Sequence, residues 1–419
     1  MTMSAMVTAP SVAGRRAIEA LRAGVPSRDA VAATGSGQSA IEDRFASLRE
    51  AAAAGKPGGL LLGGGFGSGK SHLLEHLARL ALDAGFTVSR VVISKETPLH
   101  DPAKVFAAAA ESAVTAGRPR PAIVEAASAL DLESRGYAEL LRWATSTGSG
   151  LNERFPATLA LFAQLRQRDA AFASSIVRFW SGDPIATVEL RRRLKEIGEA
   201  RPSLPPVAAR DLGGQRIMFA AKLLAAAGSA GWVILFDEVE LIGRYSLLQR
   251  AKSYAEIARW MSGEHGGRGV PIAAVLAITD DFEAAVITGR NDRELVPEKL
   301  RAKQTPEATA LAAAALRGMR VIDRETQLLT PPDDAELEQA YARLKGLHGE
   351  VFGWQPPDIG GLERLGATRI RQYVRAWINE WDLLRLDPTY RPETEVVDIL
   401  SEYREDPDLE PGEGGAELS

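Results

Sequence analysis

A glycine-rich loop between an apolar run and a helical pattern constrains the fold more than any other feature of this sequence. The loop is Gly64-Gly65-Phe66-Gly67-Ser68-Gly69-Lys70-Ser71, which fits the pattern G-x-x-x-x-G-K-[ST]. The apolar segment Gly59 to Leu62 precedes it, and leucines at helical spacing follow it. A phosphate-binding loop lies between a strand and a helix in this way, so the sequence predicts binding of a nucleoside triphosphate.

The residue types of the loop suit this chemistry. Glycines let backbone N–H groups turn toward phosphate oxygens without a Cβ in the way, and a helix that begins at Lys70 points the positive end of its dipole at the same anion. We expect Lys70 to reach the β and γ phosphates of ATP and Ser71 to place its hydroxyl on Mg²⁺. The expected nucleotide-binding residues are Gly64, Gly65, Phe66, Gly67, Ser68, Gly69, Lys70, Ser71 and His72.

A second apolar run, Trp232 to Phe236, ends in the two carboxylates Asp237 and Glu238. Such a continuous run is typical of a strand that is buried on both faces of a parallel sheet. We expect Asp237 to hold Mg²⁺, directly or through water, and Glu238 to orient and polarise the attacking water. An acidic pair at a strand end often serves only to solvate it, but the phosphate-binding loop earlier in the chain favours the catalytic interpretation.

Composition excludes several other classes of function. The chain has 419 residues, enough for two or three domains, and its net charge of -5 gives no global basic field for nucleic acid. It has no cysteine, which rules out disulfides, thiol catalysis and cysteine-ligated zinc, and its 5 histidines are scattered. No apolar run reaches the roughly 18 residues that a membrane span needs, so we expect no membrane association and a cytoplasmic location.

The chain divides by pattern into four parts. We expect an N-terminal helical segment over residues 1–57, an α/β core over 58–322 with a large helical insertion at about 100–210, a helical lid over 323–388 and a flexible acidic tail over 389–419. No parallel strand is evident beyond Asp323. The Gly24-Val25-Pro26 turn precedes the loop, and Val25 and Pro26 are either adenine contacts or only a turn between two packed helices.

Two further features leave alternatives open. Arg191, Arg192 and Arg193 form either a solvated helix face or a surface for DNA or a partner. Thr279 ends a third apolar run, which begins at Pro271. Because ligands of open α/β sheets bind at the carboxyl ends of the strands, Thr279 either touches the γ phosphate or the attacking water, or caps the next helix.

Together, the loop, Asp237-Glu238, the polar end of the following strand and an arginine on a C-terminal helix resemble the AAA+ ATPases over about residues 15–388. The resemblance implies that Thr279 is sensor 1. It also implies that Arg369, in Gly366-Ala367-Thr368-Arg369, is sensor 2, with a catalytic role for both residues. AAA+ rings need an arginine finger, for which Arg301 is our choice among the competing arginines Arg290, Arg293, Arg301 and Arg317.

Four segments resemble more specifically the ATP-binding proteins of BREX phage-exclusion systems: 67–74, 91–96, 179–184 and 235–241. This resemblance implies a bacterial antiphage role, with DNA, a helicase or other defence proteins as partners. The leading hypothesis is therefore an α/β, AAA+-like, Mg²⁺-dependent ATPase that assembles on DNA, with a partner or as a homo-oligomer. The rivals are a nucleotide-gated switch with slow turnover and a DNA-binding scaffold whose nucleotide only stabilises the fold.

Overall fold

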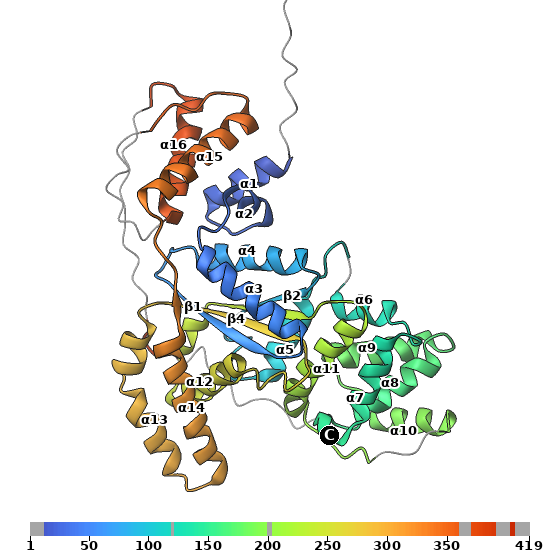
Figure 1. Cartoon of the computed structure of the whole chain (residues 1–419). Coiled ribbons are helices and arrows are strands. Elements are labelled where there is room, and N and C mark those ends of the chain that lie inside the picture. Colours follow the sequence, from blue (N-terminus) through green and yellow to red (C-terminus); the bar gives the residue numbers. More distant parts are fainter. Residues whose placement is uncertain (1–11, 119–120, 199–202, 360–369, 391–402, 407–419) are drawn as a thin grey trace, which may run out of the picture.

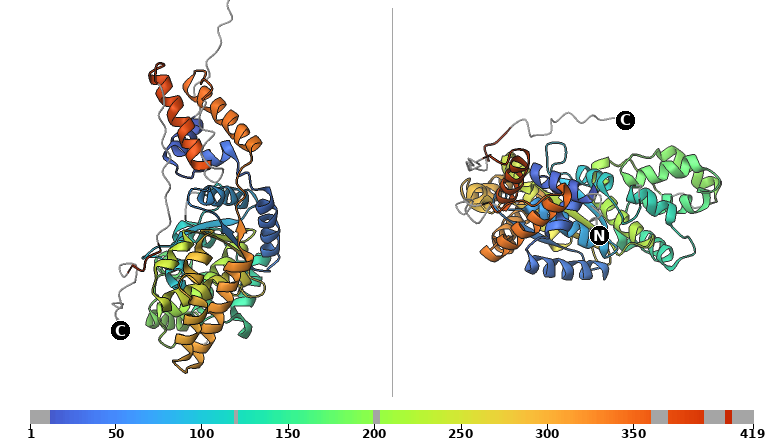
Figure 2. Two further views of the ribbon diagram at one scale, coloured as in Figure 1. Left: turned by 90° about the vertical axis from the view of Figure 1, so that its left-hand side faces the viewer. Right: turned by 90° about the horizontal axis from the view of Figure 1, so that it is seen from above.

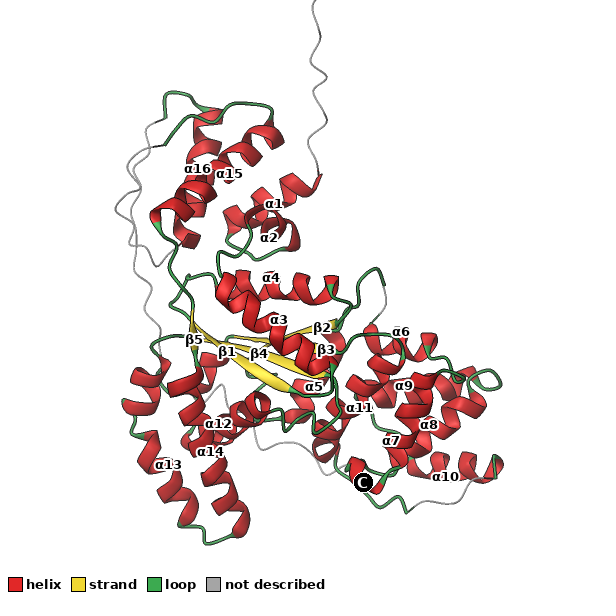
Figure 3. Ribbon diagram, in the orientation of Figure 1, coloured by secondary structure: helices red, strands yellow, loops and turns green. Residues whose placement is uncertain are grey.

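The computed structural model describes residues 12–118, 121–198, 203–359, 370–390 and 403–406. Its centre is a five-stranded sheet whose pairings are all parallel, in the order β2-β3-β4-β1-β5. The expected α/β architecture with a parallel sheet is therefore confirmed (Figure 3). The strands are β1 (Gly58–Gly63), β2 (Thr87–Val92), β3 (Trp232–Asp237), β4 (Ile272–Ile278) and β5 (Gln327–Leu328).

The apolar runs form central strands because both of their faces are covered. Leu61 of β1 belongs to one hydrophobic cluster, whereas its neighbours Leu60 and Leu62 belong to the cluster on the opposite face. Successive side chains of a strand point to opposite faces, so a strand buried on both sides must be apolar at every position. Strand β4 follows this rule along its whole length, since all seven of its residues are buried.

Helices cover the two faces of the sheet (Figure 1). One face carries α3 (Ser39–Ala53) and α4 (Lys70–Asp83), which directly follows the glycine-rich loop. The other face carries α5 (Pro102–Ser112), α11 (Gly213–Ala226) and α12 (Leu247–Ser262), against which α13 (Asp292–Arg301) and α14 (Pro306–Glu325) pack. Two short elements follow the ends of β3 and β4, namely the 3-10 helix η3 (Val239–Arg244) and the π-helix η4 (Glu283–Thr288).

The stretch expected to be a helical insertion contains no strand among its described residues. It forms the group of helices beside the sheet in Figure 1, which packs against α11. Aromatic rings fill its interior, and the indole of Trp180 donates a hydrogen bond of 2.9 Å to Thr158 there. After α5 the elements are α6 (Ala122–Ala129), α7 (Arg135–Thr145), η1 (Thr147–Ser149), α8 (Arg154–Leu165), α9 (Ala170–Ser181), α10 (Thr187–Glu196) and η2 (Ala209–Leu212).

Helices from the N-terminal part of the chain and from residues 334–386 meet above the sheet (Figure 2). The N-terminal helices α1 (Val12–Ala23) and α2 (Arg28–Thr34) share one hydrophobic cluster with α15 (Asp334–Phe352) and α16 (Ile370–Leu386). Trp381 of α16 is fully buried in this cluster. The side chain of Ser27 accepts a hydrogen bond from Ala30 N and caps α2. We call these four helices the helical cap.

Two expectations about the C-terminal part are wrong. A fifth parallel strand exists beyond Asp323, because Gln327 and Leu328 pair with Leu62 and Gly63 of β1. A two-residue strand is held by backbone pairing at the sheet edge and needs no apolar run, so no sequence pattern marks it. The acidic tail is also not free throughout, since residues 403–406 make hydrogen bonds and ion pairs with the core.

Candidate nucleotide site

The glycine-rich loop has the geometry that its sequence predicts. It follows β1, and the N–H of Gly64 donates a hydrogen bond of 3.2 Å to Ile278 O at the end of β4. Gly67 and Gly69 have φ angles of 79° and 99°, which residues with a Cβ rarely adopt. Gly69 immediately precedes α4, so the free N–H groups of the first helical turn face the loop.

Lys70 lies inside this loop rather than in solvent. Its side chain is buried, and Nζ donates hydrogen bonds of 2.6 Å to Gly64 O and 3.2 Å to Gly65 O. A buried ammonium group is retained only where acceptors or anions surround it. The loop therefore concentrates a positive charge and several backbone donors at one point, which suits a phosphate group.

Two further features of the loop concern the packing at Gly64 and the hydrogen bonding of Ser68. A Cβ on Gly64 would lie only 2.5 Å from Ser68 Oγ, so a side chain there would require Ser68 to move. Ser68 Oγ is itself buried and has no hydrogen-bond partner among the described residues. A buried hydroxyl without a partner is costly, and a phosphate oxygen would satisfy it. The close packing at Gly64 and the buried hydroxyl of Ser68 therefore suit a loop that binds a phosphorylated ligand.

The carboxylates of β3 lie beside the loop. Asp237 pairs in register with Val92, and its Oδ1 accepts a hydrogen bond of 3.0 Å from the N–H of Glu238. Glu238 has the left-handed backbone φ of 57°, which is strained for a residue with a side chain, as are the φ angles of Asn291 and Gln304. Burial, and then the charge of Asp237, raise the pKa of Glu238, while Lys70 lowers it.

A third carboxylate, Glu240, was not anticipated from the sequence. It lies on η3, two residues after Glu238, and its Oε2 is buried without a hydrogen-bond partner in the described structure. Burial raises its pKa to about 7, although the positive charge of Lys70 opposes the shift. The alternation of acidic and apolar residues in Asp237-Glu238-Val239-Glu240 is the signal in the sequence that points to it.

One cavity of about 750 Å³ joins these residues. Its floor is the loop from Gly65 to Ser71 with Asp237, Glu238 and Glu240, and its roof is the helical cap. Val25 and Pro26 lie on its wall, where the sequence suggested an adenine contact. Sequence reasoning missed Arg343 of α15 and Arg371 of α16, two cavity-lining cations far from the loop in sequence.

Other expected nucleotide-binding residues lie at the rim or behind the loop. Phe66 is half exposed and Ser71 lines the cavity. The Nε2 of His72 contacts Gly35 O at 2.9 Å and Thr34 Oγ1 at 3.1 Å, so this ring ties α4 to the end of α2. Burial lowers the pKa of His72, which favours the neutral ring.

Thr279 is not among the residues that line the cavity. Its side chain is buried, and its Oγ1 shares a hydrogen bond with the hydroxyl of Tyr403. The next residue, Asp280, is the one that approaches the loop, because a Cβ on Gly65 would lie 3.6 Å from Asp280 Oδ2. The strand end is thus where we expected it, but its threonine faces the C-terminal segment.

The remaining arginines of interest divide into three groups. Arg369 lies outside the described residues. Arg375 points away from the cavity, as its Nε donates a hydrogen bond of 3.2 Å to Arg22 O. Among the arginine-finger candidates, Arg290 and Arg293 form ion pairs, whereas Arg301 and Arg317 are exposed, with no ion pair to any described residue.

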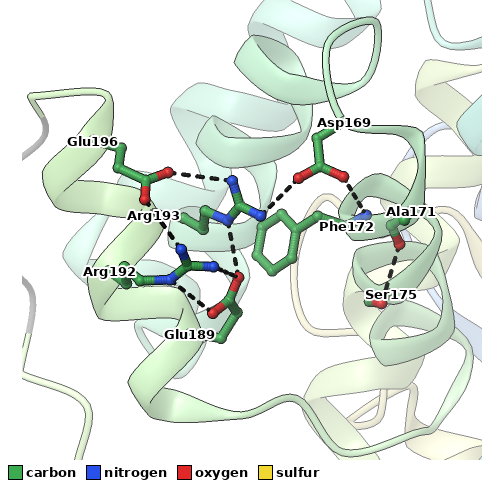
Figure 4. Close-up of polar contacts among 8 residues, drawn as sticks. All are labelled: Asp169, Ala171, Phe172, Ser175, Glu189, Arg192, Arg193 and Glu196. Atoms are coloured by element: carbon green, nitrogen blue, oxygen red, sulfur yellow. Dashed lines mark hydrogen bonds and ion pairs between the residues drawn. The ribbon is translucent and has the colours of Figure 1, made fainter.

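The basic run of α10 is paired within the protein (Figure 4). Arg193 contacts Asp169 at 2.7 Å and Glu189 at 2.9 Å, and Arg192 contacts Glu189 at 2.6 Å. Arg191 donates to Leu204 O at 3.2 Å. The neighbouring carboxylates offset these charges, so the run gives little support to a DNA-binding surface.

Within the described ranges there is no group of three or more His, Cys, Asp or Glu that could hold a metal ion by itself. The donors available to Mg²⁺ at the loop are the Ser71 hydroxyl and Asp237, and an ion bound by so few protein groups takes its other ligands from phosphates and water. No described helix is both long and apolar enough to span a membrane.

Comparison with known proteins finds a family that is similar to the N-terminal part of the chain. The family model described as BREX system ATP-binding protein BrxC/D matches residues 11–130, which include α1 to α6, the loop and the first two strands. No curated protein and no solved structure matches the chain. Residues 11–130, with the glycine-rich loop, are therefore similar to the BREX system ATP-binding protein BrxC/D family.

Proposed function

We propose that the chain is a Mg²⁺-dependent ATPase of the AAA+ type. The observation that carries this proposal is the convergence of Lys70, Asp237 and Glu238 on one cavity below the helical cap. Strand β4 lies between β1 and β3, so the loop and the carboxylates stand two strands apart, with the end of β4 between them. The cavity of about 750 Å³ that they line has room for a phosphate group and a water molecule.

The chain's residues have separate roles in this proposal. Lys70 and the N–H groups at the start of α4 bind the phosphates, and Ser71 with Asp237 would hold Mg²⁺, which neutralises phosphate charge when bound. Glu238 orients the attacking water and accepts its proton. Its raised pKa brings the carboxyl nearer to the range in which a general base works at neutral pH.

The partners follow from the family name and remain part of the proposal. A BREX system ATP-binding protein works with other components of that system, and we propose a helicase or nuclease, DNA and further copies of this chain as candidates. A slow nucleotide-gated switch is the second candidate function. It is favoured by the hydrogen bond between Thr279 and Tyr403, which occupies a side chain that the first candidate uses for catalysis.

Two variants test the proposal. Lys70→Ala removes the charge at the phosphates and should abolish ATP binding in calorimetry, while Lys56→Ala, at an exposed lysine before β1, should bind as the parent does. Glu238→Gln should retain ATP binding and lose turnover by roughly two powers of ten or more, because the amide does not accept a proton. Unchanged affinity in Lys70→Ala would refute the site, and parental turnover in Glu238→Gln would favour the slow switch.

A further inference from the structure

We propose that residues 403–406 are an internal ligand of this protein. Their tyrosyl and acidic side chains contact η3, α12 and the residues that follow β4, and we infer that this docking restrains ATP turnover. The second half of the inference rests on the ATPase function proposed above. The first half, the docking itself, rests only on the contacts of the segment.

Tyr403 is the centre of the docked segment. Its hydroxyl donates a hydrogen bond of 2.7 Å to Asp281 Oδ1 and shares a second one with Thr279 Oγ1. Its ring meets Phe282 edge-on, with 5.9 Å between the ring centroids. Both the polar tip and the apolar body of the tyrosine therefore have partners in the loop that follows β4.

The absence of a side chain at Gly243 leaves space for this ring. Gly243, near the end of η3, lies beside it, and a Cβ at that position would lie 2.9 Å from Tyr403 Cδ1 and from a methyl group of Val286. Gly243 has no positive φ that would itself require glycine. The missing side chain thus serves close packing, and the ring of Tyr403 is one of the groups that need the space.

The acidic residues of the segment meet three arginines. Glu405 Oε1 lies 2.7 Å from Arg250 Nη1 and 3.3 Å from Arg290 Nη1. Asp406 lies 2.7 Å from Arg244, and its N–H donates a hydrogen bond of 3.1 Å to Arg244 O. The carboxylates are thus placed where the protein concentrates positive charge.

Charge and burial around Glu405 explain why an acid is needed. Burial, followed by the charge of Arg250, lowers the pKa of Arg290, and Glu405 opposes this. A basic cavity of about 700 Å³ adjoins the segment, and Lys299 and Lys303 line it together with Arg250 and Arg290. Asp292, which pairs with Arg250 at 2.8 Å, offsets part of this positive charge, and Glu405 adds a second carboxylate to it.

The docked segment is connected to the nucleotide site through two short elements. One is η3, which begins directly after Glu238 and carries Glu240 at one end and Arg244 at the other. The other is the strand end at Thr279 and Asp280, where Asp280 approaches the glycine-rich loop. While Tyr403 is docked, the Thr279 hydroxyl is engaged and is withheld from phosphate or water.

The segment is held by contacts that a partner or salt would displace. The side chains of Glu405 and Asp406 remain 57% and 30% exposed, and exposed ion pairs are weak and are screened by salt. Docking is thus reversible, as a regulatory contact must be. Because Glu405 and Asp406 provide much of the contact, docking should weaken as ionic strength rises.

Hydrogen exchange of the full-length chain tests the docking. In the parent, the Asp406 amide should be protected by its bond to Arg244 O. Tyr403→Ala should accelerate its exchange at least tenfold, and Tyr403→Phe, which keeps the ring but loses the hydroxyl, should have a smaller effect. Arg404→Ala is the matched control, because Arg404 is exposed within the same segment. Parental protection in Tyr403→Ala would overturn the docking.

Steady-state ATP turnover tests the restraint. Tyr403→Ala and Glu405→Gln should each hydrolyse ATP several-fold faster than the parent and Arg404→Ala, and a peptide of residues 400–410 added to Tyr403→Ala should slow it again. Turnover of Tyr403→Ala equal to that of Arg404→Ala would overturn the restraint. Failure of the ATPase itself would appear separately, as unchanged turnover in Glu238→Gln, and the exchange result would still decide the docking.

Discussion

Glu240 offers a quantitative test of the electrostatics of the cavity. The substitution Glu240→Gln keeps the shape of the side chain but removes its proton equilibrium. In the folded protein burial raises the pKa of this carboxyl to about 7, against a value of 4.5 for an ordinary glutamate. Since one pKa unit corresponds to about 1.4 kcal/mol, the ionised form is disfavoured by about 3 kcal/mol in the folded state.

The sign of the effect follows from proton linkage. Between pH 4.5 and about 7 the folded chain holds a proton on Glu240 that the unfolded chain has lost. The contribution of Glu240 to the free energy of unfolding is therefore fully present below pH 4.5 and is lost as pH rises toward 7. The glutamine variant has no such loss, so its stability relative to the parent should rise by about 2–3 kcal/mol between about pH 5 and pH 8.

Urea unfolding followed by tryptophan fluorescence at several pH values measures this difference. Comparing each variant with the parent at the same pH cancels the other titrating groups. Glu264→Gln, at an exposed glutamate after α12, is the control and should track the parent at every pH. A stability difference between Glu240→Gln and the parent that stays constant with pH would refute the raised pKa and the desolvated environment behind it.

Three further predictions concern the packing of the cavity and the core. Gly24→Ala should destabilise the protein by about 1 kcal/mol or more, because Gly24 has a φ of 68° and the added Cβ would lie 2.6 Å from Arg371 Nε. An unchanged melting temperature in thermal unfolding would contradict this. Arg250→Met should lower the free energy of unfolding by about 3–5 kcal/mol, since it leaves the fully buried Asp292 without its ion pair at 2.8 Å. A decrease of less than about 1 kcal/mol in urea unfolding would refute this prediction. Arg371→Ala should weaken ATP binding roughly tenfold in calorimetry and Arg375→Ala should not, because Arg371 lines the cavity and Arg375 does not. Equal ATP affinities of these two variants would exclude Arg371 from the site.

The sequence predicted the local part of the site well. The strand before the loop, the helix from Lys70 and the strand that ends at Asp237 lie where the patterns place them. Each of these depends on neighbours within a few residues: glycine where the backbone turns, apolar runs where both faces are buried, and a helix start at the phosphates. These local features depend on consecutive residues, so they can be predicted directly from the sequence.

The tertiary structure alone decided how distant segments complete the cavity. The helical cap combines α1 and α2 with α15 and α16, and it brings Arg343 and Arg371 over a loop that lies far from them in sequence. The direction in which Thr279 faces depends on Tyr403, which is 124 residues away. The strand β5 is only two residues long and exists because β1 offers an edge to pair with.

The physical reason for this division is the range of the interactions. Backbone preference and hydrophobic periodicity act over one or two turns of chain, so residues 58–71 determine a strand, a loop and a helix start by themselves. Burial, ion pairing and ring contacts depend on which surfaces meet after folding, and many pairings of distant segments satisfy the same local pattern. The raised pKa of Glu240 and the docking of residues 403–406 depend on contacts between distant segments, which form only in the folded chain.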